Sequence, residues 1–175
     1  MKKLLAISSL LLFTVFIYSG CQQQEERTYT DAEVQKNMDN VAKLWNAGDI
    51  ELVDSLYAEN CIRHNADLGD AKGPEEIKKF VKWVYTAYPD FKVTFDEPMK
   101  FKDRIVTTFK ATATNDGPLS ENMPPTGKQM SFNGIGVSKM ENGKITEEWI
   151  YYNSLTIYSQ LGYKLVPAEE KEMKK

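Results

Sequence analysis

The sequence predicts an α+β domain in which the helices come first along the chain and the strands follow. Apolar residues recur at helical spacing between residues 30 and 89, and from Phe91 onward apolar residues alternate with polar ones. This change of period is typical of domains in which helices pack on one face of an antiparallel sheet. We expect about three helices over a curved antiparallel sheet, forming a cone whose open end offers a ligand pocket.

Three helices are expected in the first half. The first begins at residues 30–33, where Thr and Glu have capping-box spacing, and ends at Gly48. Its apolar stripe consists of Val34, Met38, Val41 and Trp45. Asp49 is placed to cap a short second helix. Pro74 suits the first turn of a third helix, and Pro89 ends it.

The strands follow from the period of two and from turn residues. Four strands are expected over residues 91–95, 105–114, 129–140 and 144–152. The last two are joined by Asn142-Gly143, a strong hairpin signal. Gly134 and Gly136 suggest a bulge or bend. Earlier in the chain, Cys61–Asn65 is a short strand with Ile62 and His64 on one face, and a last helix is expected over Ser154–Leu161.

The N-terminus has the pattern of a secretory signal. Lys2 and Lys3 precede an apolar run from Leu4 to Tyr18. This run is shorter than a membrane-spanning helix, which needs about 20 residues. The sequence from Tyr18 to Cys21 resembles a lipobox, at which bacteria attach lipid to the cysteine and cleave before it. We therefore expect a lipoprotein anchored at Cys21 in the cell envelope, facing the periplasm or the cell exterior.

Cleavage would leave one domain and little else. Residues 1–20 form the expected signal peptide, 21–29 a tether, 30–165 the domain and 166–175 a flexible tail. The full chain has a net charge of −3, and loss of two lysines with the signal leaves −5. This balance argues against a nucleic-acid partner, because no basic stripe is present to neutralise phosphates. Cys61 would be a lone thiol, expected to be buried and inert.

Several short motifs share the order and spacing of a known family. They are Trp45-Asn46-Ala47-Gly48-Asp49, His64, Gly73, Tyr88-Pro89-Asp90-Phe91, Pro125-Thr126-Gly127-Lys128, Asn142-Gly143-Lys144-Ile145, Glu148-Trp149 and Gln160-Leu161-Gly162. The chain from about residue 31 to 163 resembles the SnoaL-like polyketide cyclases, also called ester cyclases, of the NTF2-like superfamily. The resemblance implies a cone-shaped α+β barrel, commonly dimeric, with an apolar cavity and no cofactor. A homodimer is therefore expected.

The resemblance also shows where this chain departs from its family. The cyclases close a ring by aldol chemistry, with an Asp four residues after the Trp of the last strand as general acid/base. Asn153 occupies that position here, and Asn115 stands where many relatives have a His. An amide cannot exchange protons near neutral pH, so general acid/base catalysis through these residues is lost.

Candidate site residues remain in the predicted strands. His64 is the single histidine and the natural proton carrier, and its family counterpart points into the cavity. Trp149, Tyr151 and Asn153 share a face that forms either sheet packing or a cavity wall. The sequence has one His and no HExxH motif, so it lacks the ligands of a zinc site. We select His64 and Asn153 as candidate catalytic residues, and His64, Asn115, Trp149 and Tyr151 as candidate ligand-binding residues.

Three functions are compatible with these observations. The cavity could bind a small, largely apolar, ring-containing molecule without chemistry. It could instead belong to an active cyclase, isomerase or hydrolase that uses His64. The domain could also be a non-catalytic envelope assembly protein. Loss of both expected proton carriers favours binding, and whether the protein is an enzyme stays open.

Overall fold

The computed structural model describes residues 28–65 and 68–164, so the expected signal peptide, Cys21 and the C-terminal tail lie outside the described residues. The fold is α+β, as predicted. The elements are, in chain order, α2 (Asp31–Ala47), η2 (Ile50–Leu52), α3 (Val53–Leu56), β1 (Tyr57–Asn65), β2 (Ala71–Lys72), α4 (Gly73–Ala87), β3 (Lys92–Phe95), β4 (Met99–Phe101), β5 (Arg104–Thr114), β6 (Gln129–Glu141), β7 (Lys144–Tyr152) and α5 (Ser154–Leu161).

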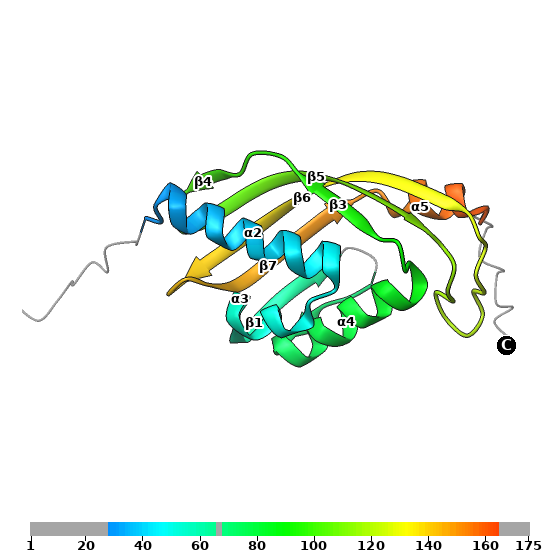
Figure 1. The fold of residues 1–175 in the computed structure, drawn as a ribbon, viewed down its shortest axis with the longest axis horizontal. Helices are drawn as coiled ribbons and strands as arrows, with labels where there is room; N and C mark the ends of the chain where they lie inside the picture. Colours follow the sequence, from blue (N-terminus) through cyan, green and yellow to red (C-terminus); the bar gives the residue numbers. More distant parts are fainter. Residues whose placement is uncertain (1–27, 66–67, 165–175) are drawn as a thin grey trace, which may run out of the picture.

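The strands form one curved sheet in the order β2-β1-β7-β6-β5-β3, with β4 also paired to β5. Helices α2 and α4 cross the same face of this sheet (Figure 1). Two details differ from the sequence-based expectation. The sheet is mixed rather than antiparallel, because β1 runs parallel to β7. It is also unclosed, since β2 and β3 at its two ends do not pair with each other.

Helix α2 has the boundaries that its sequence predicts. The Thr30 hydroxyl accepts a hydrogen bond from the Glu33 backbone N–H at 3.2 Å, and the Glu33 carboxylate accepts one from the Thr30 N–H at 2.9 Å. At the other end, Gly48 has a φ of +66°, a conformation that costs glycine little. A Cβ at residue 48 would also lie only 3.1 Å from the Tyr85 ring, which is a tight contact. The predicted capping box and stop are confirmed.

The second and third helices are present, with one correction. The Asp49 side chain makes no capping hydrogen bond, because the chain turns there through backbone bonds of the short helix η2. Helix α4 has Pro74 in its first turn and ends at Ala87, before Pro89. None of the helices in the described ranges has the length and apolar content needed to span a bilayer.

The four later strands match their predicted ranges closely, β1 begins at Tyr57 rather than Cys61, and β2 and β4 are additional short strands. The hairpin between β6 and β7 turns at Asn142 and Gly143, whose φ values of +51° and +81° confirm the turn signal. The bulge suggested at Gly134 and Gly136 is absent, because pairing with both neighbouring strands is continuous there. Gly134 instead makes room for the Phe109 ring, which a Cβ at that position would meet.

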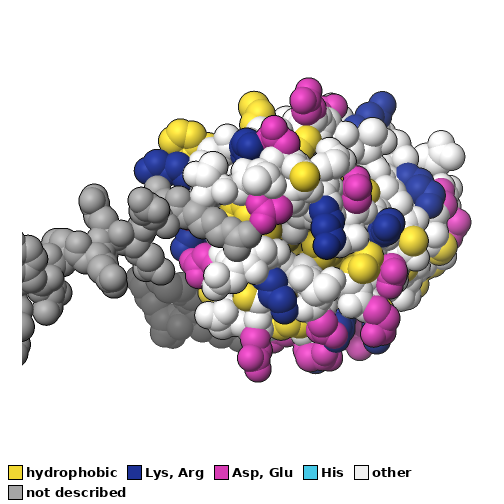
Figure 2. Space-filling model, turned by 60° about the vertical axis from the view of Figure 1, so that its left-hand side comes forward, with side chains coloured by type: hydrophobic (Ala, Val, Ile, Leu, Met, Phe, Trp, Pro, Cys, Tyr) yellow, Lys and Arg dark blue, Asp and Glu magenta, His cyan; other side chains and the backbone are white. Residues whose placement is uncertain are grey.

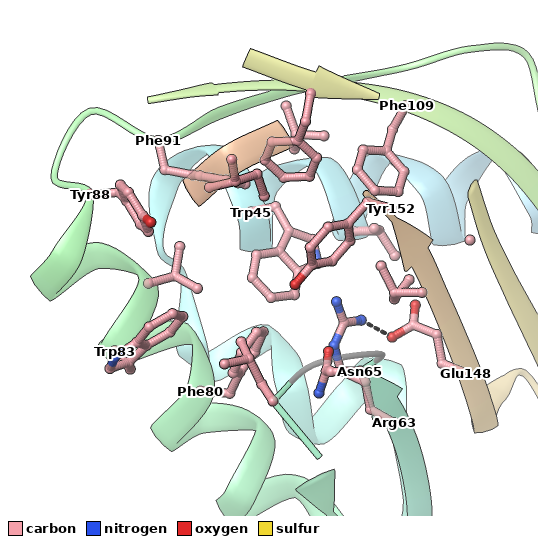
Figure 3. Close-up of a pocket in the computed structure, with 18 of the residues that line it drawn as sticks. Trp45, Arg63, Asn65, Phe80, Trp83, Tyr88, Phe91, Phe109, Glu148 and Tyr152 are labelled. Carbon is pink, nitrogen blue, oxygen red and sulfur yellow. Dashed lines mark hydrogen bonds and ion pairs between the residues drawn. The ribbon is translucent and has the colours of Figure 1, made fainter. Parts of the chain in front are cut away.

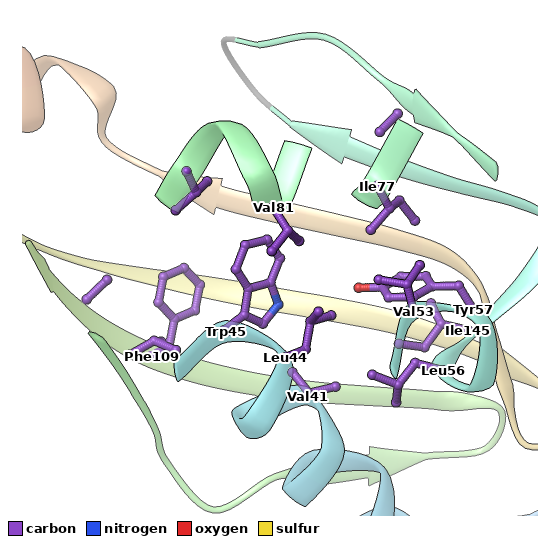
Figure 4. Packing of buried hydrophobic residues seen from close by; sticks show 14 of the residues in the cluster. Val41, Leu44, Trp45, Val53, Leu56, Tyr57, Ile77, Val81, Phe109 and Ile145 are labelled. Atoms are coloured by element: carbon purple, nitrogen blue, oxygen red, sulfur yellow. The ribbon is translucent and has the colours of Figure 1, made fainter. Parts of the chain in front are cut away.

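The core lies between the helices and the concave face of the sheet (Figure 4). Leu44, Val53, Ile77 and Ile145 are fully buried within it, and each comes from a different element. Cys61 is a buried free thiol, and burial raises its pKa, so the thiol is protonated near neutral pH. On the face shown in Figure 2, acidic and basic side chains are interspersed, without a single-sign patch.

The burial of Leu44 predicts a measurable core defect. Leu44→Ala should lower the free energy of unfolding by about 2–5 kcal/mol, because the lost methyl groups leave a cavity. Leu155→Ala is the matched control, since Leu155 is exposed on α5. Urea denaturation of the two variants measures the difference. Equal effects of both substitutions would contradict the assignment of Leu44 to the core.

Candidate ligand-binding site

A cavity of about 280 Å³ lies between the helices and the sheet. This volume is close to the lower end of small-molecule pockets, which span roughly 300–1,000 Å³. Its walls are mostly aromatic and come from helices and strands alike (Figure 3). The aromatic lining residues are Trp45, Phe80, Trp83, Tyr88, Phe91, Phe95, Phe109, Phe132, Tyr152 and Tyr158.

The rings contact one another and leave extended flat surfaces. Trp45 of α2 meets Phe80 of α4 edge to face, with ring centroids 6.0 Å apart. Phe80 in turn stacks on Trp83 at 5.7 Å. On the sheet side, Phe132 contacts both Phe109 and Tyr152, at 6.1 and 5.0 Å. Such surfaces suit a ligand that contains a ring, because offset and edge contacts between rings are favourable.

One ion pair stands in this apolar surface. Arg63 of β1 donates a hydrogen bond from Nη1 to Oε2 of Glu148 on β7, and their residues are 5 % and 4 % exposed. In the described part of the cavity wall, these are the two charged residues. The Arg63 guanidinium also lies over the Trp45 ring, 4.8 Å from its centroid, and 5.6 Å from that of Phe80.

Two hydroxyl groups support Glu148. The Tyr57 hydroxyl donates to Oε2 at 2.9 Å, and the Ser138 hydroxyl donates to Oε1 at 3.4 Å. Burial, together with the charge of Glu148, raises the pKa of Tyr57 well above its ordinary value. The phenol therefore stays protonated and remains a donor. Both oxygens of the buried carboxylate are thus hydrogen-bonded, as a buried charge requires.

His64 lies on the opposite face of β1, and the prediction that it lines the cavity is wrong. Alternate residues of a strand point to opposite faces, and the inward residues of β1 are Cys61, Arg63 and Asn65. The His64 Nδ1 lies 2.9 Å from Asp70 Oδ1, and its Nε2 lies 3.1 Å from Glu147 Oε1.

Trp149, Tyr151 and Asn153 also lie away from the cavity lining. The inward residues of β7 are Glu148, Ile150 and Tyr152, so the prediction that Trp149 and Tyr151 line the cavity is wrong. Trp149 stacks on His64 with centroids 5.5 Å apart on the outer face of the sheet. Asn153 is the N-cap of α5, where its side-chain oxygen accepts a hydrogen bond from the Thr156 N–H at 3.4 Å.

Asn115 is fully buried and has a structural position rather than one on the cavity wall. Its amide nitrogen donates to the Gly117 carbonyl at 2.7 Å, and its oxygen accepts from the Thr126 N–H and hydroxyl, both at 3.0 Å. These bonds hold together the loop that connects β5 and β6. The same loop places Leu119, Ser120 and Met123 against the cavity. Asn115 therefore supports the site without facing it.

Comparison with known proteins places this geometry in a family. The family model for SnoaL-like polyketide cyclases matches residues 35–161. The chain therefore belongs to the SnoaL-like polyketide cyclase family. A comparison of the sequence with curated proteins found no match. The agreement of the matched region with the motifs in the sequence confirms the family resemblance.

Solved structures share the fold at low sequence identity. TsrD from Streptomyces laurentii is 21% identical with a TM-score of 0.69, and the match covers 77% of this chain and 98% of that one. A proposed SnoaL-like polyketide cyclase from Jannaschia sp. CCS1 is 16% identical, with a TM-score of 0.66 and coverage of 79% and 99%. An LEH-like epoxide hydrolase from M. tuberculosis is 15% identical, with a TM-score of 0.59 and coverage of 74% and 90%. These similarities establish the NTF2-like fold.

The position of His64 predicts a pH-dependent contribution to stability. Its hydrogen bond to Glu147, with a further contribution from Asp70, raises the pKa of His64 above its ordinary value. Protonated His64 therefore stabilises the fold below about pH 6.5, and this contribution is lost as the pH rises through the folded-state pKa. Because the group is partly exposed, the effect should stay below about 1 kcal/mol.

The measurement is urea denaturation between pH 5 and pH 8 for the unmodified protein and His64→Gln. The variant should have a flatter stability profile across this window, since glutamine does not titrate. Identical profiles for the two proteins would show that the contacts with Glu147 and Asp70 do not contribute to stability.

Proposed function

We propose that the protein binds a small, largely apolar, ring-containing molecule in the cavity between the helices and the sheet. The main observation in support is the aromatic wall, in which rings from α2 and α4 and rings from the sheet surround a cavity of about 280 Å³. Burying a ring against these surfaces would remove apolar area from water at roughly 25 cal/mol per Å².

The positions of the family's proton carriers support binding over aldol cyclisation. Asn153 replaces the family's Asp, and its side chain is occupied in capping α5. His64 points to the outer face, where two carboxylates hold it. Within the described lining, the charged groups are already paired with each other. A catalytic role for His64, or for Asn153, would require a substrate outside this cavity.

A side chain added to the cavity floor tests the proposal. Gly136 of β6 lines the cavity. A Cβ there would lie 3.3 Å from Ile150 Cδ1, so the Ile150 side chain would have to move by a few tenths of an ångström. Gly136→Leu should therefore fill part of the cavity and lower the affinity for tetralin about tenfold or more. Tryptophan fluorescence reports the binding, because Trp45 and Trp83 line the site.

Val137→Leu is the matched control, because Val137 is the next residue on β6 and faces the other side of the sheet. It should bind tetralin like the unmodified protein. Native mass spectrometry of the purified chain adds an independent test by detecting a copurified small molecule. No binding of tetralin and no copurified molecule would contradict the proposal. Aldol cyclisation of a polyketide ester by the unmodified chain would favour the enzyme instead.

We also propose that Cys21 carries a lipid that anchors the domain to the cell envelope. The support is the sequence pattern of Lys2, Lys3, the apolar run and the lipobox-like residues that end at Cys21. Two or three acyl chains hold a protein on a bilayer firmly, whereas one chain does not. The described domain starts at residue 28, so only a short segment would separate it from the anchor.

Cys21→Ser should abolish metabolic labelling with palmitate and leave the unprocessed precursor, because the hydroxyl cannot form the thioether. Cys61→Ser is the control and should be labelled normally, since Cys61 is buried in the core. Gel electrophoresis and labelling in a bacterial host measure both. Normal labelling and processing of Cys21→Ser would rule out the anchor.

A further inference from the structure

Arg63 has hydrogen-bonding capacity that the protein does not use. A guanidinium carries five N–H donors in a fixed plane. Among the described residues, Arg63 donates from Nη1 to Glu148, and its Nε is buried with no partner. Leaving a buried donor without an acceptor is unfavourable, so such an atom in a cavity wall calls for an explanation.

The unpartnered Nε–H lies on one edge of the guanidinium. One N–H of Nη2 points to the same side of the planar group, and two donors in this geometry can hold an oxygen in a fork. Glu148 is engaged through Nη1 and therefore leaves that edge without a carboxylate. Figure 3 shows the guanidinium among the cavity residues, with Trp45, Phe80 and Glu148 beside it.

The surroundings of Arg63 restrict what can occupy this edge. Trp45 and Phe80 lie against the guanidinium at 4.8 and 5.6 Å, so an acceptor there would be shielded from water. The positive charge is already balanced by Glu148, with which Arg63 forms a buried ion pair. A second anion would bring one uncompensated negative charge into an apolar cavity, which is costly. A neutral oxygen acceptor adds no charge.

We infer that the ligand carries a neutral carbonyl oxygen, as in a ketone, an ester or a lactone, and that Arg63 binds this oxygen through its Nε edge. The inference rests on the proposed binding function and assigns Arg63 as its specificity-determining residue. Glu148, with Tyr57 and Ser138, is a positioning group that holds the guanidinium in place. The aromatic rings recognise the ring, and Arg63 selects ring compounds that carry a carbonyl over those that do not.

Three probes of one skeleton test the inference with the purified full-length chain. Tetralin is the hydrocarbon, 1-tetralone adds one carbonyl oxygen, and tetrahydro-1-naphthoate adds a carboxylate. The unmodified protein should bind 1-tetralone about tenfold or more tightly than tetralin, although the ketone is the more water-soluble compound. It should also bind the ketone about tenfold or more tightly than the carboxylate. Tryptophan fluorescence titration measures all three affinities.

Variants must remove the Arg63 edge without leaving Glu148 alone in the cavity. The double variant Arg63→Met/Glu148→Gln removes both charges and should bind the two neutral probes with a ratio near one or in favour of tetralin. Arg63→Lys keeps the charge but not the planar fork, and it should lose most of the preference for the ketone. It serves as the test if the double variant does not fold. Arg104→Met, on the outer face beside Trp149, is the matched control and should keep the preference.

The outcomes separate this inference from the proposed function. Binding of tetralin and 1-tetralone with equal affinity by the unmodified chain would overturn the role of Arg63 while leaving ring binding intact. A preference for the ketone that persists in the folded variants would do the same. Tighter binding of the carboxylate than of the ketone would refute the neutral-oxygen specificity. Failure of all three probes to bind would overturn this inference, and together with the absence of a copurified molecule it would overturn the binding function itself.

Discussion

The parallel pairing of β1 with β7 organises the site. In this register Arg63 lies directly beside Glu148, and the pair meets on the concave face. The strands come from opposite ends of the domain, so the contact joins residues 85 positions apart. Helix α4 packs on β1 and brings Phe80 over the guanidinium. Helix α2 brings Trp45 against the same guanidinium. A shift of β1 by one residue in this register would reverse the faces of its side chains, turn Arg63 toward solvent and leave Glu148 without its partner.

A buried ion pair in an aromatic cavity is more readily explained by binding than by stability. Removing two charges from water costs more than their mutual attraction commonly returns, and apolar residues of similar size are often equally stable there. Here the pair is further surrounded by Tyr57 and Ser138, so four side chains are committed to one polar point in an otherwise apolar wall. Such a point gives a ligand a defined orientation, which rings alone do not provide.

Membership of the SnoaL-like polyketide cyclase family does not by itself decide the chemistry, because one fold serves many reactions. The substitutions in this chain have definite structural consequences. Asn153 begins α5, and Asn115 ties the β5–β6 loop to the end of α4 through Ala87 and Gly117. In both places an amide is suited to its task, because it donates or accepts hydrogen bonds without carrying charge. The charged residues of the described cavity wall are Arg63 and Glu148, and they are paired with each other.

Local signals in the sequence were sufficient for most of the elements. The capping box at Thr30, the stop at Gly48 and the Asn142-Gly143 turn act within a few residues, so the backbone they dictate does not depend on the rest of the fold. The change of apolar period separated the helical part from the strand part for the same reason. These features, with the family motifs, determined the α+β class and the order of the elements.

The site required tertiary information. The sequence points to His64, Trp149 and Tyr151 on the correct strands, but the inward face carries Arg63, Glu148 and Tyr152 instead. Because a strand alternates with a period of two, sequence shows which residues share a face and leaves open which face meets the helices. Buried charges made this ambiguity worse, since an Arg and a Glu resemble solvent-facing residues until their partners are known. The sequence by itself therefore determined most of the elements, many of their ends and the family. The tertiary structure decided which set of alternate side chains on β1 and on β7 faces the helices. Only the pairing of distant strands and the packing of α2 and α4 determine which side is buried.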